Sequence, residues 1–360
     1  MSDILLSPFH LGGLGLPNRI VMAPMTRTRA SADGVPKPVV AQYYAQRASA
    51  GLIVTECTEI SEQARGIYCA PGVHTAPQVA AWEAVVAAVH GAGGRIYQQL
   101  WHAGRTGHSA IRGGALPVAP SAIAARAKAR TPQGPQDLEV PRALGTAEVA
   151  GVVEDFRRAA RNAREAGFDG VELHAANGYL VDEFLQDGSN QRADRYGGSV
   201  LNRCRFAIEV MEALADVWGA QRTGIKISPS TRNNDMMDSD PLATFGTLMR
   251  ELSRLNVGYV HAMEPSEVDL KTGSVILRDP TRALRRMFSG AMITNVGYAL
   301  ESGNAVIAAG TADLVSFGKP FISNPDLPAR FAAGAPLAPG DFTTFYGADE
   351  RGYTTYPPLA

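Results

Sequence analysis

The chain has 360 residues, of which 45% are hydrophobic and 19% are charged, and its formal net charge is −1. This composition is typical of a folded globular protein, and the balanced charge gives no sign of binding to nucleic acid or to an anionic membrane. No apolar run approaches the roughly 18 residues of a membrane-spanning helix, and the first residues lack a secretory-signal pattern. The three cysteines show no CxxC spacing. We therefore expect a cytoplasmic protein with reduced thiols.

Short β-rich runs alternate with longer helical patterns along the chain. The runs are dense in Val, Ile and Leu rather than strictly alternating, which is typical of parallel strands covered by helices. The predicted strands span residues 19–25, 51–56, 95–100, 170–175, 224–228, 258–263, 291–296 and 313–318. The predicted helices span residues 77–94, 146–168, 202–218, 242–255 and 301–310.

Eight strands that alternate with helices predict an α/β fold, a single (β/α)8 TIM barrel over residues 1–360. A doubly wound sheet is the alternative, but no GxGxxG sequence follows the first strand. The helix at 146–168 is expected to have its N-cap at Thr146 and its C-cap at Gly167. Residues 1–18 contain no long element and are expected to close the barrel floor. Residues 105–145 form a long insertion after the third strand, which we expect to cap the site as a lid or pocket wall.

Polar side chains occur at the C-terminal ends of the predicted strands. In a TIM barrel these ends meet at one rim, where the active site lies. Each residue taken singly is most simply a hydrogen-bonded barrel residue, but their number exceeds what packing requires. The set comprises Thr26, Arg27, Glu56, Cys57, Gln99, Trp101, His102, His174, Asn177, Tyr179, Lys226, His261, Asn295 and Lys319.

The loops after the last two strands have the composition of a phosphate site. They read NVGY (295–298) and FGKPFISNP (317–325), and barrels often bind phosphate at this place through backbone amides. Lys319 would supply the countercharge, although a plain turn would also account for the glycines.

His174, Asn177 and Tyr179 lie within six residues at the end of the fourth strand. No HxxxH pattern or acidic cluster favours a metal site, and no GxSxG turn favours a serine nucleophile. His174 and Asn177 offer two neighbouring donors that suit a carbonyl or phenolate oxygen, and Tyr179 offers a weakly acidic proton.

Seven motifs resemble, in order and spacing, those of the Old Yellow Enzyme family of FMN-dependent ene-reductases. The resemblance is to the bacterial branch that contains pentaerythritol tetranitrate, N-ethylmaleimide and morphinone reductases, with kinship to plant oxophytodienoate reductases. Thr26, where another branch carries cysteine, favours this branch. The motifs are APMTR (23–27), QLWHAGR (99–105), ELHAANGYL (172–180), SNQRADRYGGS (189–199), ISPS (227–230), FISNPDL (321–327) and FYGADERGYTTYP (345–357).

The resemblance implies bound FMN, reduction by NADPH or NADH, and hydride transfer to an electron-poor alkene. His174 and Asn177 would bind the carbonyl oxygen of the substrate, and Tyr179 would protonate Cα. Trp101 and Tyr346 would line the substrate pocket. The implied FMN contacts are Ala23, Pro24 and Met25 by backbone, Thr26 at flavin O4, Gln99 at the pyrimidine edge, Cys57 near the flavin edge, Lys226 beside N1 and O2, and Val296, Gly297, Gly318 and Lys319 around the phosphate.

Several positions depart from the pattern of the family, and four of them lie in the expected FMN site. Lys226 and Lys319 stand where arginine is usual, so the charge is kept but the planar fork is lost. Val296 occupies a usual glycine position, and Cys57 replaces a small residue.

Two other functions fit the residues. A phosphate-binding barrel lyase or aldolase would use Lys226 as a Schiff-base amine, and a non-catalytic barrel would have lost its cofactor. The expected partners are small molecules, and the expected assembly is a monomer or a homodimer.

Overall fold

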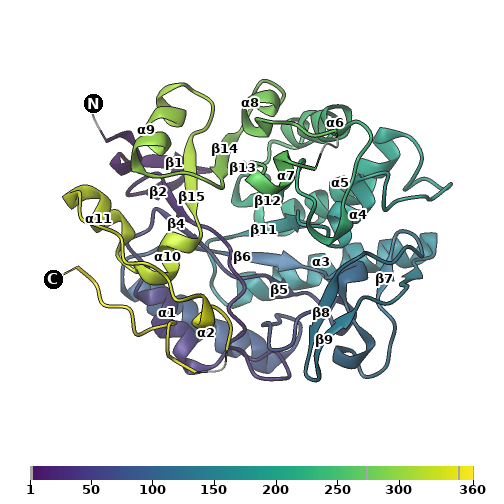
Figure 1. Cartoon of the computed structure of the whole chain (residues 1–360), viewed down its shortest axis with the longest axis horizontal. Coiled ribbons are helices and arrows are strands. Elements are labelled where there is room, and N and C mark those ends of the chain that lie inside the picture. Colours follow the sequence, from purple (N-terminus) through teal and green to yellow (C-terminus); the bar gives the residue numbers. More distant parts are fainter. Residues whose placement is uncertain (1–2, 273–274, 348, 360) are drawn as a thin grey trace.

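Eight parallel strands surround the centre of the molecule and close into a barrel (Figure 1). The computed structural model describes residues 3–272, 275–347 and 349–359. Each barrel strand pairs with its neighbour in chain order, and β15 returns to pair with β3, where Val315 lies opposite Ile20. The predicted TIM barrel is therefore confirmed. The barrel strands are β3 (Ile20–Met22), β4 (Leu52–Val54), β6 (Ile96–Trp101), β11 (Gly170–Ala175), β12 (Thr223–Ile227), β13 (Tyr259–Met263), β14 (Ala291–Asn295) and β15 (Leu314–Phe317).

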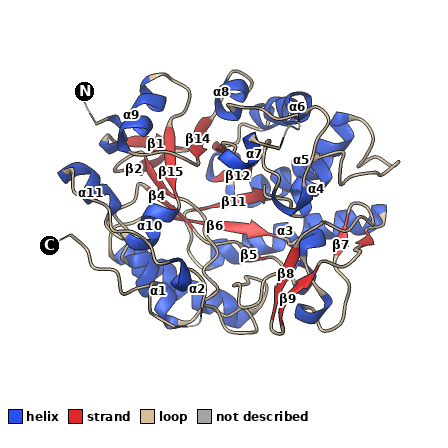
Figure 2. Cartoon of the chain, in the orientation of Figure 1, coloured by secondary structure: helices blue, strands red, loops and turns tan. Residues whose placement is uncertain are grey.

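Helices lie outside the barrel strands (Figure 2). The five predicted helices are present as α2, α3, α5, α6 and α9, and short helices that lack a full amphipathic repeat were not predicted. The N-cap of α3 is Gly145 rather than Thr146, and its C-cap is Ala166 rather than Gly167, which follows directly with a positive φ of 86°. Within the described residues, no helix combines the length and apolar character needed to cross a lipid bilayer. The helices are α1 (Pro38–Ala45), α2 (Ala76–Gly91), α3 (Thr146–Glu165), α4 (Leu180–Leu185), α5 (Val200–Trp218), α6 (Pro241–Arg254), α7 (Glu267–Leu270), α8 (Pro280–Arg285), α9 (Leu300–Ala308), α10 (Lys319–Ser323) and α11 (Leu327–Ala333).

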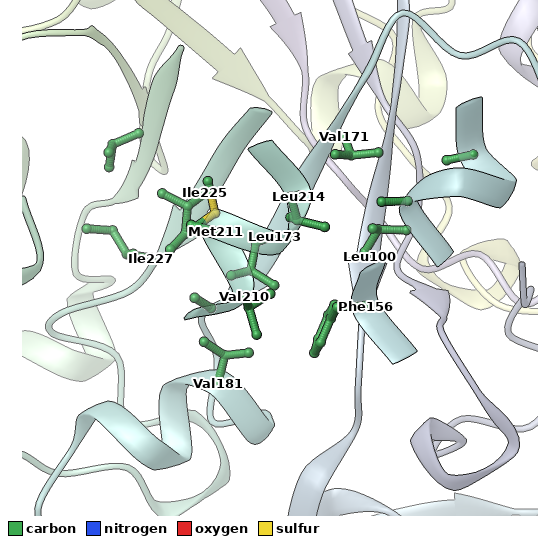
Figure 3. Packing of buried hydrophobic residues seen from close by; sticks show 14 of the residues in the cluster. Leu100, Phe156, Val171, Leu173, Val181, Val210, Met211, Leu214, Ile225 and Ile227 are labelled. Atoms are coloured by element: carbon green, nitrogen blue, oxygen red, sulfur yellow. The ribbon is translucent and has the colours of Figure 1, made fainter. Parts of the chain in front are cut away.

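Strand β11 carries apolar side chains on its outer face and polar side chains on its inner face. Val171 and Leu173 belong to the main hydrophobic core together with Phe156 of α3 and Leu214 of α5 (Figure 3). Because side chains alternate along a strand, Glu172 and His174 face the opposite side, the barrel interior. Aliphatic residues therefore anchor the strand, and the residues between them are free to carry polar groups.

The N-terminal segment closes the barrel floor, as expected. Strands β1 (Phe9–Leu11) and β2 (Leu14–Leu16) form an antiparallel hairpin whose two-residue turn has positive φ at Gly12 and Gly13. Leucines from both strands pack with inward-facing barrel residues in one buried cluster. The sequence pattern had suggested no long element here, although Gly-Gly between apolar residues is a hairpin signal.

The insertion after β6 is more regular than its sequence suggested. It contains the short parallel pair β7 (Val118–Ala119) and β10 (Arg142–Ala143) and the antiparallel hairpin β8 (Lys128–Thr131) and β9 (Gly134–Asp137). Outside the insertion, the remaining strand β5 (Thr58–Glu59) pairs in parallel with β6. The insertion reaches the barrel mouth through Arg130, which lines the central cavity.

Candidate active site

A cavity of about 1150 Å³ opens at the C-terminal ends of the barrel strands. Nearly all of the predicted site residues line it, although they come from strands and loops far apart in the sequence. The lining includes Ala23, Pro24, Met25, Thr26, Cys57, Gln99, His174, Asn177, Tyr179, Lys226, Val296, Gly297, Gly318, Lys319 and Tyr346.

Trp101 differs from its predicted position because it does not line the cavity. Its side chain is buried in a small apolar cluster with Cys57 and Ala103. Its ring meets that of Tyr179 edge-on, with centroids 5.0 Å apart and an interplanar angle of 87°. Trp101 therefore packs against Tyr179 from the apolar cluster and not from the cavity, and it restricts where the phenol ring can lie.

His174 has a defined protonation state. Burial and the nearby charge of Lys226 hold the pKa of the imidazole well below its usual value, so the ring is neutral at physiological pH. The backbone N–H of Ala176 donates to Nδ1 over 3.4 Å, which identifies Nδ1 as the acceptor. The proton of the neutral ring then resides on Nε2, and His174 offers one donor to the cavity.

Three residues of the loop after β12 form hydrogen bonds with Asn177. Its backbone N–H donates to Ser228 Oγ (2.7 Å), and its carbonyl oxygen accepts from Asn234 Nδ2 (2.8 Å). Its φ of 59° lies in the left-handed region that asparagine tolerates. Because Asn233 Nδ2 donates to Oδ1 of Asn177 (3.2 Å), the amide nitrogen of Asn177 remains available as a second donor.

The Tyr179 phenol lies between aromatic neighbours at the cavity wall. Its ring is perpendicular to the imidazole of His174, with centroids 4.9 Å apart. Burial raises the pKa of Tyr179 well above its usual value, so the phenol keeps its proton at physiological pH. A protonated phenol thus lies beside the two donors.

A buried polar network lies inside the barrel beneath the cavity. Glu172 accepts hydrogen bonds from Gln99 Nε2 (2.7 Å) and from the Tyr259 hydroxyl (3.1 Å). His261 Nδ1 also lies 3.0 Å from this carboxylate, and its Nε2 lies 2.6 Å from Ser316 Oγ. Burial opposes ionisation of Glu172, but the surrounding donors and positive charge hold its pKa below the usual value. Glu172 is therefore an ionised carboxylate inside the barrel.

Lys226 is the positive side chain that faces this network. It is 4% exposed, and its ammonium makes no hydrogen bond to any described residue. Burial lowers the pKa of Lys226 to about 8, although Glu172 opposes the shift. Gln99 is oriented by the same network, because its amide nitrogen is held by Glu172 and its oxygen is left toward the cavity.

Thr26 and Cys57 lie side by side at the ends of β3 and β4. The Thr26 hydroxyl and the Cys57 thiol are 3.1 Å apart. Burial raises the pKa of the Cys57 thiol far above its usual value, so this cysteine is not a thiolate nucleophile. It contributes a neutral partner for Thr26.

The loop after β14 carries backbone strain at the predicted phosphate end. Val296 and Gly297 have φ of 78° and 80°. Glycine adopts this conformation freely, whereas a β-branched residue is strained there. Gly318 and Lys319, where α10 begins, line the same part of the cavity.

Three buried arginines hold the C-terminal segment, residues 341–357, against the barrel mouth. Arg27 donates to the backbone oxygens of Phe345 (2.9 Å) and Gly352 (2.8 Å). Arg29 donates to the oxygens of Thr344 (2.9 Å) and Phe345 (2.9 Å), and Arg47 donates to Tyr353 (3.4 Å). These bonds place Tyr346 at the cavity. Ala348, within the motif at 345–357, lies outside the described residues.

Comparison with known proteins identifies this architecture. Residues 4–338 match the NADH:flavin oxidoreductase / NADH oxidase family. The chain belongs to this family. It is 43% identical over 358 residues to 12-oxophytodienoate reductase 1 of Oryza sativa subsp. japonica, an alignment that covers 98% of this chain and 92% of the relative.

Solved structures agree over the whole length. Morphinone reductase matches with a TM-score of 0.94 and 45% identity, covering 99% of this chain and 96% of the other. The Old Yellow Enzyme homologue from Zymomonas mobilis matches with a TM-score of 0.95 and 43% identity, covering 99% of both chains. The protein is therefore an Old Yellow Enzyme family member, an oxidoreductase that uses FMN and a nicotinamide reductant.

The residues around the cavity fit an FMN. The buried ammonium of Lys226 faces the cavity without a hydrogen bond from the described chain, and it suits an electron-rich heterocycle. The free oxygen of Gln99 suits an N–H donor. At the other end, the glycine loops and Lys319 suit a phosphate. Within the described part of the chain, no group of three or more His, Cys, Asp or Glu side chains is arranged to hold a metal ion.

Sequence reasoning missed several residues of this site, and three of them stand out by their contacts. Glu172 organises the buried network, Asn233 orients Asn177, and Arg130 reaches the cavity from the insertion. Glu172 had a detectable signal, because a carboxylate inside an apolar strand run requires buried partners. Asn233 and Arg130 had none, since their loops meet the site only after folding.

Proposed function

We propose that the protein is an ene-reductase that reduces an activated alkene at the expense of NADPH or NADH. The substrate class is an α,β-unsaturated carbonyl compound, a maleimide or a nitro compound. FMN held beside Gln99, Lys226 and Lys319 would supply the hydride chemistry that links the nicotinamide to Cβ of the alkene. The relatives are named as reductases of 12-oxophytodienoate and of morphinone, and both names denote carbonyl compounds.

The observation that carries the proposal is the pair of oriented donors at His174 and Asn177. Negative charge develops on the carbonyl oxygen as hydride reaches Cβ, and donors aimed at that oxygen favour the transition state. His174 is neutral with its proton on Nε2, and the amide nitrogen of Asn177 is free because Asn233 occupies its oxygen. Both donors are fixed before the substrate arrives.

Tyr179 completes the reaction by donating its proton to Cα. Burial keeps the phenol protonated, so it holds a proton whenever the substrate binds. Its ring is confined by Trp101 and His174, which limits the direction of proton transfer. Lys226 and Gln99 would act on the cofactor side of the site, where they would bind and polarise the flavin.

The decisive experiment separates the two half-reactions in the Tyr179→Phe variant. Anaerobic stopped-flow absorbance is followed first during reduction with NADPH or NADH and then during reoxidation with 2-cyclohexenone. Reoxidation should slow by about 10²- to 10⁴-fold, because a positioned general acid is lost, while reduction by the nicotinamide should stay close to the parent rate. An equal loss in both half-reactions would contradict the assigned proton donor.

Family membership favours the oxidoreductase over the two other functions that fit the sequence. The lowered pKa of Lys226 is also a property of Schiff-base lysines. Borohydride treatment in the presence of a carbonyl substrate distinguishes the two, since only a lyase-type Lys226 would be trapped as a stable adduct. We expect no adduct on the flavin-loaded protein.

A further inference from the structure

Cys57 and Thr26 form a hydrogen-bonded pair in the wall of the cavity. They follow the neighbouring strands β4 and β3, and the Cys57 sulfur lies 3.1 Å from the Thr26 hydroxyl oxygen. Both residues line the cavity, but Cys57 is only 3% exposed whereas Thr26 is half-buried. The thiol is therefore the more buried member of the pair, and the hydroxyl is the more accessible one.

The direction of this hydrogen bond follows from the partners that each group has. Burial raises the pKa of the Cys57 thiol, so the sulfur carries a proton at physiological pH. Among the described residues, the Thr26 oxygen is the only acceptor that this thiol reaches. Donation from sulfur to oxygen leaves the hydroxyl proton of Thr26 free for an acceptor in the cavity, so two hydrogen bonds can form. The opposite direction allows only one, because the thiol proton would have no partner.

The pair lies in the part of the cavity that suits the redox-active ring of FMN. Tyr179, the proposed proton donor, packs against the apolar cluster that contains Cys57. Strand β4 also pairs with β6, which carries Gln99 and its free amide oxygen. A hydroxyl proton that Thr26 offers to the cavity is therefore offered to the isoalloxazine ring.

We propose that Cys57 is a positioning residue for the cofactor and that it acts through Thr26. Its thiol donates to the Thr26 oxygen and so directs the hydroxyl proton toward a carbonyl oxygen of the isoalloxazine ring. The inference concerns the flavin alone, and it does not depend on which alkene the enzyme reduces.

This arrangement favours the reduced form of the flavin. Two-electron reduction increases the negative charge on the carbonyl oxygens of the ring, so a donor aimed at one of them binds reduced FMN more tightly than oxidised FMN. A hydroxyl that accepts a hydrogen bond is polarised and becomes a stronger donor itself. Because a thiol is a weak donor, we expect Cys57 to contribute about twofold to fivefold to the preference for reduced FMN.

The first test measures the midpoint potential of the FMN-loaded protein by anaerobic equilibration with a redox dye. Cys57→Ala removes the donor and should lower the potential by about 10–20 mV, which is a twofold to fivefold loss for a two-electron couple. Cys57→Ser keeps a donor of similar size and should restore the parent potential or exceed it. Cys204→Ala is the matched control and should leave the potential unchanged, since Cys204 is also buried but does not line the cavity.

The same substitution in a second background separates positioning from a direct effect of the thiol on the ring. Thr26→Val lacks the hydroxyl, so Cys57→Ala in this background should cause no further shift in potential. An equal shift in both backgrounds would overturn the inference, because the thiol would then act on the flavin without Thr26. An unchanged potential in Cys57→Ala, or a potential in Cys57→Ser as low as in Cys57→Ala, would overturn it as well.

Infrared spectroscopy tests the hydrogen bond itself, in the flavin-free and in the FMN-loaded protein. The S–H stretching band is well separated from other protein bands, and it moves to lower frequency when the thiol donates. The difference spectrum between the parent and Cys57→Ala should contain such a lowered band, and the Cys57 band should move to higher frequency in Thr26→Val. A Cys57 band at the frequency of a free thiol in the parent would show that sulfur is not the donor and would overturn the inference.

Discussion

Asn233 donates a 3.2 Å hydrogen bond from Nδ2 to the carboxamide oxygen of Asn177. The two residues are 56 positions apart and lie on loops after neighbouring barrel strands. A carboxamide can turn over and exchange its donor for its acceptor, and in the observed arrangement this bond occupies the oxygen of Asn177 and leaves its nitrogen for the substrate. Half of the proposed oxyanion site is therefore set by a residue that need not touch the substrate.

Removal of that bond gives the first prediction. Asn233→Ala should slow reoxidation by 2-cyclohexenone by about twofold, because the Asn177 amide would occupy both orientations about equally. Asn177→Ala should cost about 10²- to 10³-fold, because the donor itself is lost. The near-isosteric Asn233→Asp provides the contrast, since a carboxylate can only accept and would draw the Asn177 nitrogen away. The stopped-flow rate of reoxidation should be higher in Asn233→Ala than in Asn233→Asp. An equal or reversed order of the two rates would contradict this orientation of Asn177.

The second prediction concerns the buried network around Glu172. Glu172→Gln should lower the free energy of unfolding of the flavin-free protein by about 1–3 kcal/mol, because an amide group cannot accept from Gln99, Tyr259 and His261 together. Urea unfolding measures the loss. Glu83→Gln on the exposed side of α2 is the matched control and should change stability by less than about 0.5 kcal/mol. Equal effects of the two variants would show that the network contributes no stability.

The third prediction is a pH dependence at Lys226. Its pKa is about 8 in the folded protein against 10.5 as the usual value. Between these values the unfolded chain binds a proton at Lys226 that the folded chain does not, so the site makes folding more favourable as pH rises from about 8 to 10.5. The gain amounts to at most about 3 kcal/mol over the window.

Lys226→Met removes this titration. Urea unfolding of the flavin-free parent and variant between pH 7 and 10.5 should give curves whose difference changes through the window and is constant below about pH 7. Parallel curves across the whole range would mean that Lys226 has its ordinary pKa when folded.

The fourth prediction follows from the strain at Val296. A positive φ costs a β-branched residue about 1–2 kcal/mol, whereas glycine accepts it and loses only about 0.5–1 kcal/mol through unfolded-state entropy. Val296→Gly should therefore raise the free energy of unfolding by up to about 1 kcal/mol. Ala305→Gly within α9 is the control and should lower it by about 1 kcal/mol. Thermal unfolding should show midpoints that move in opposite directions, and a lower midpoint for Val296→Gly would exclude strain at this position.

The barrel could be predicted because its signals are local. Each barrel strand is a short aliphatic run such as 224–228, and each long helix has a full amphipathic repeat. Short helices such as α4 and α8 were missed because six residues do not establish a period. The β8–β9 hairpin was missed because its sequence, rich in basic and polar residues, lacks aliphatic alternation.

The site was predictable only in part. Residues next to strand ends, such as His174 and Lys226, could be placed because a barrel brings all of its strand ends to one rim. The orientation of Trp101 could not be derived, since the last residue of a strand can face the cavity or the apolar cluster behind it. Neither could the contacts of Asn233 and Arg130, which depend on how separate loops meet.

The fastening of the C-terminal segment has a consequence for how this enzyme can change. Arg27, Arg29 and Arg47 grip main-chain oxygens, and every amino acid carries such an oxygen. Side chains at the entrance, such as Phe342 and Tyr346, can therefore be exchanged without removing these hydrogen bonds. The substrate range can therefore change during evolution or in a mutant library, while the positions of the catalytic groups beneath the entrance are preserved.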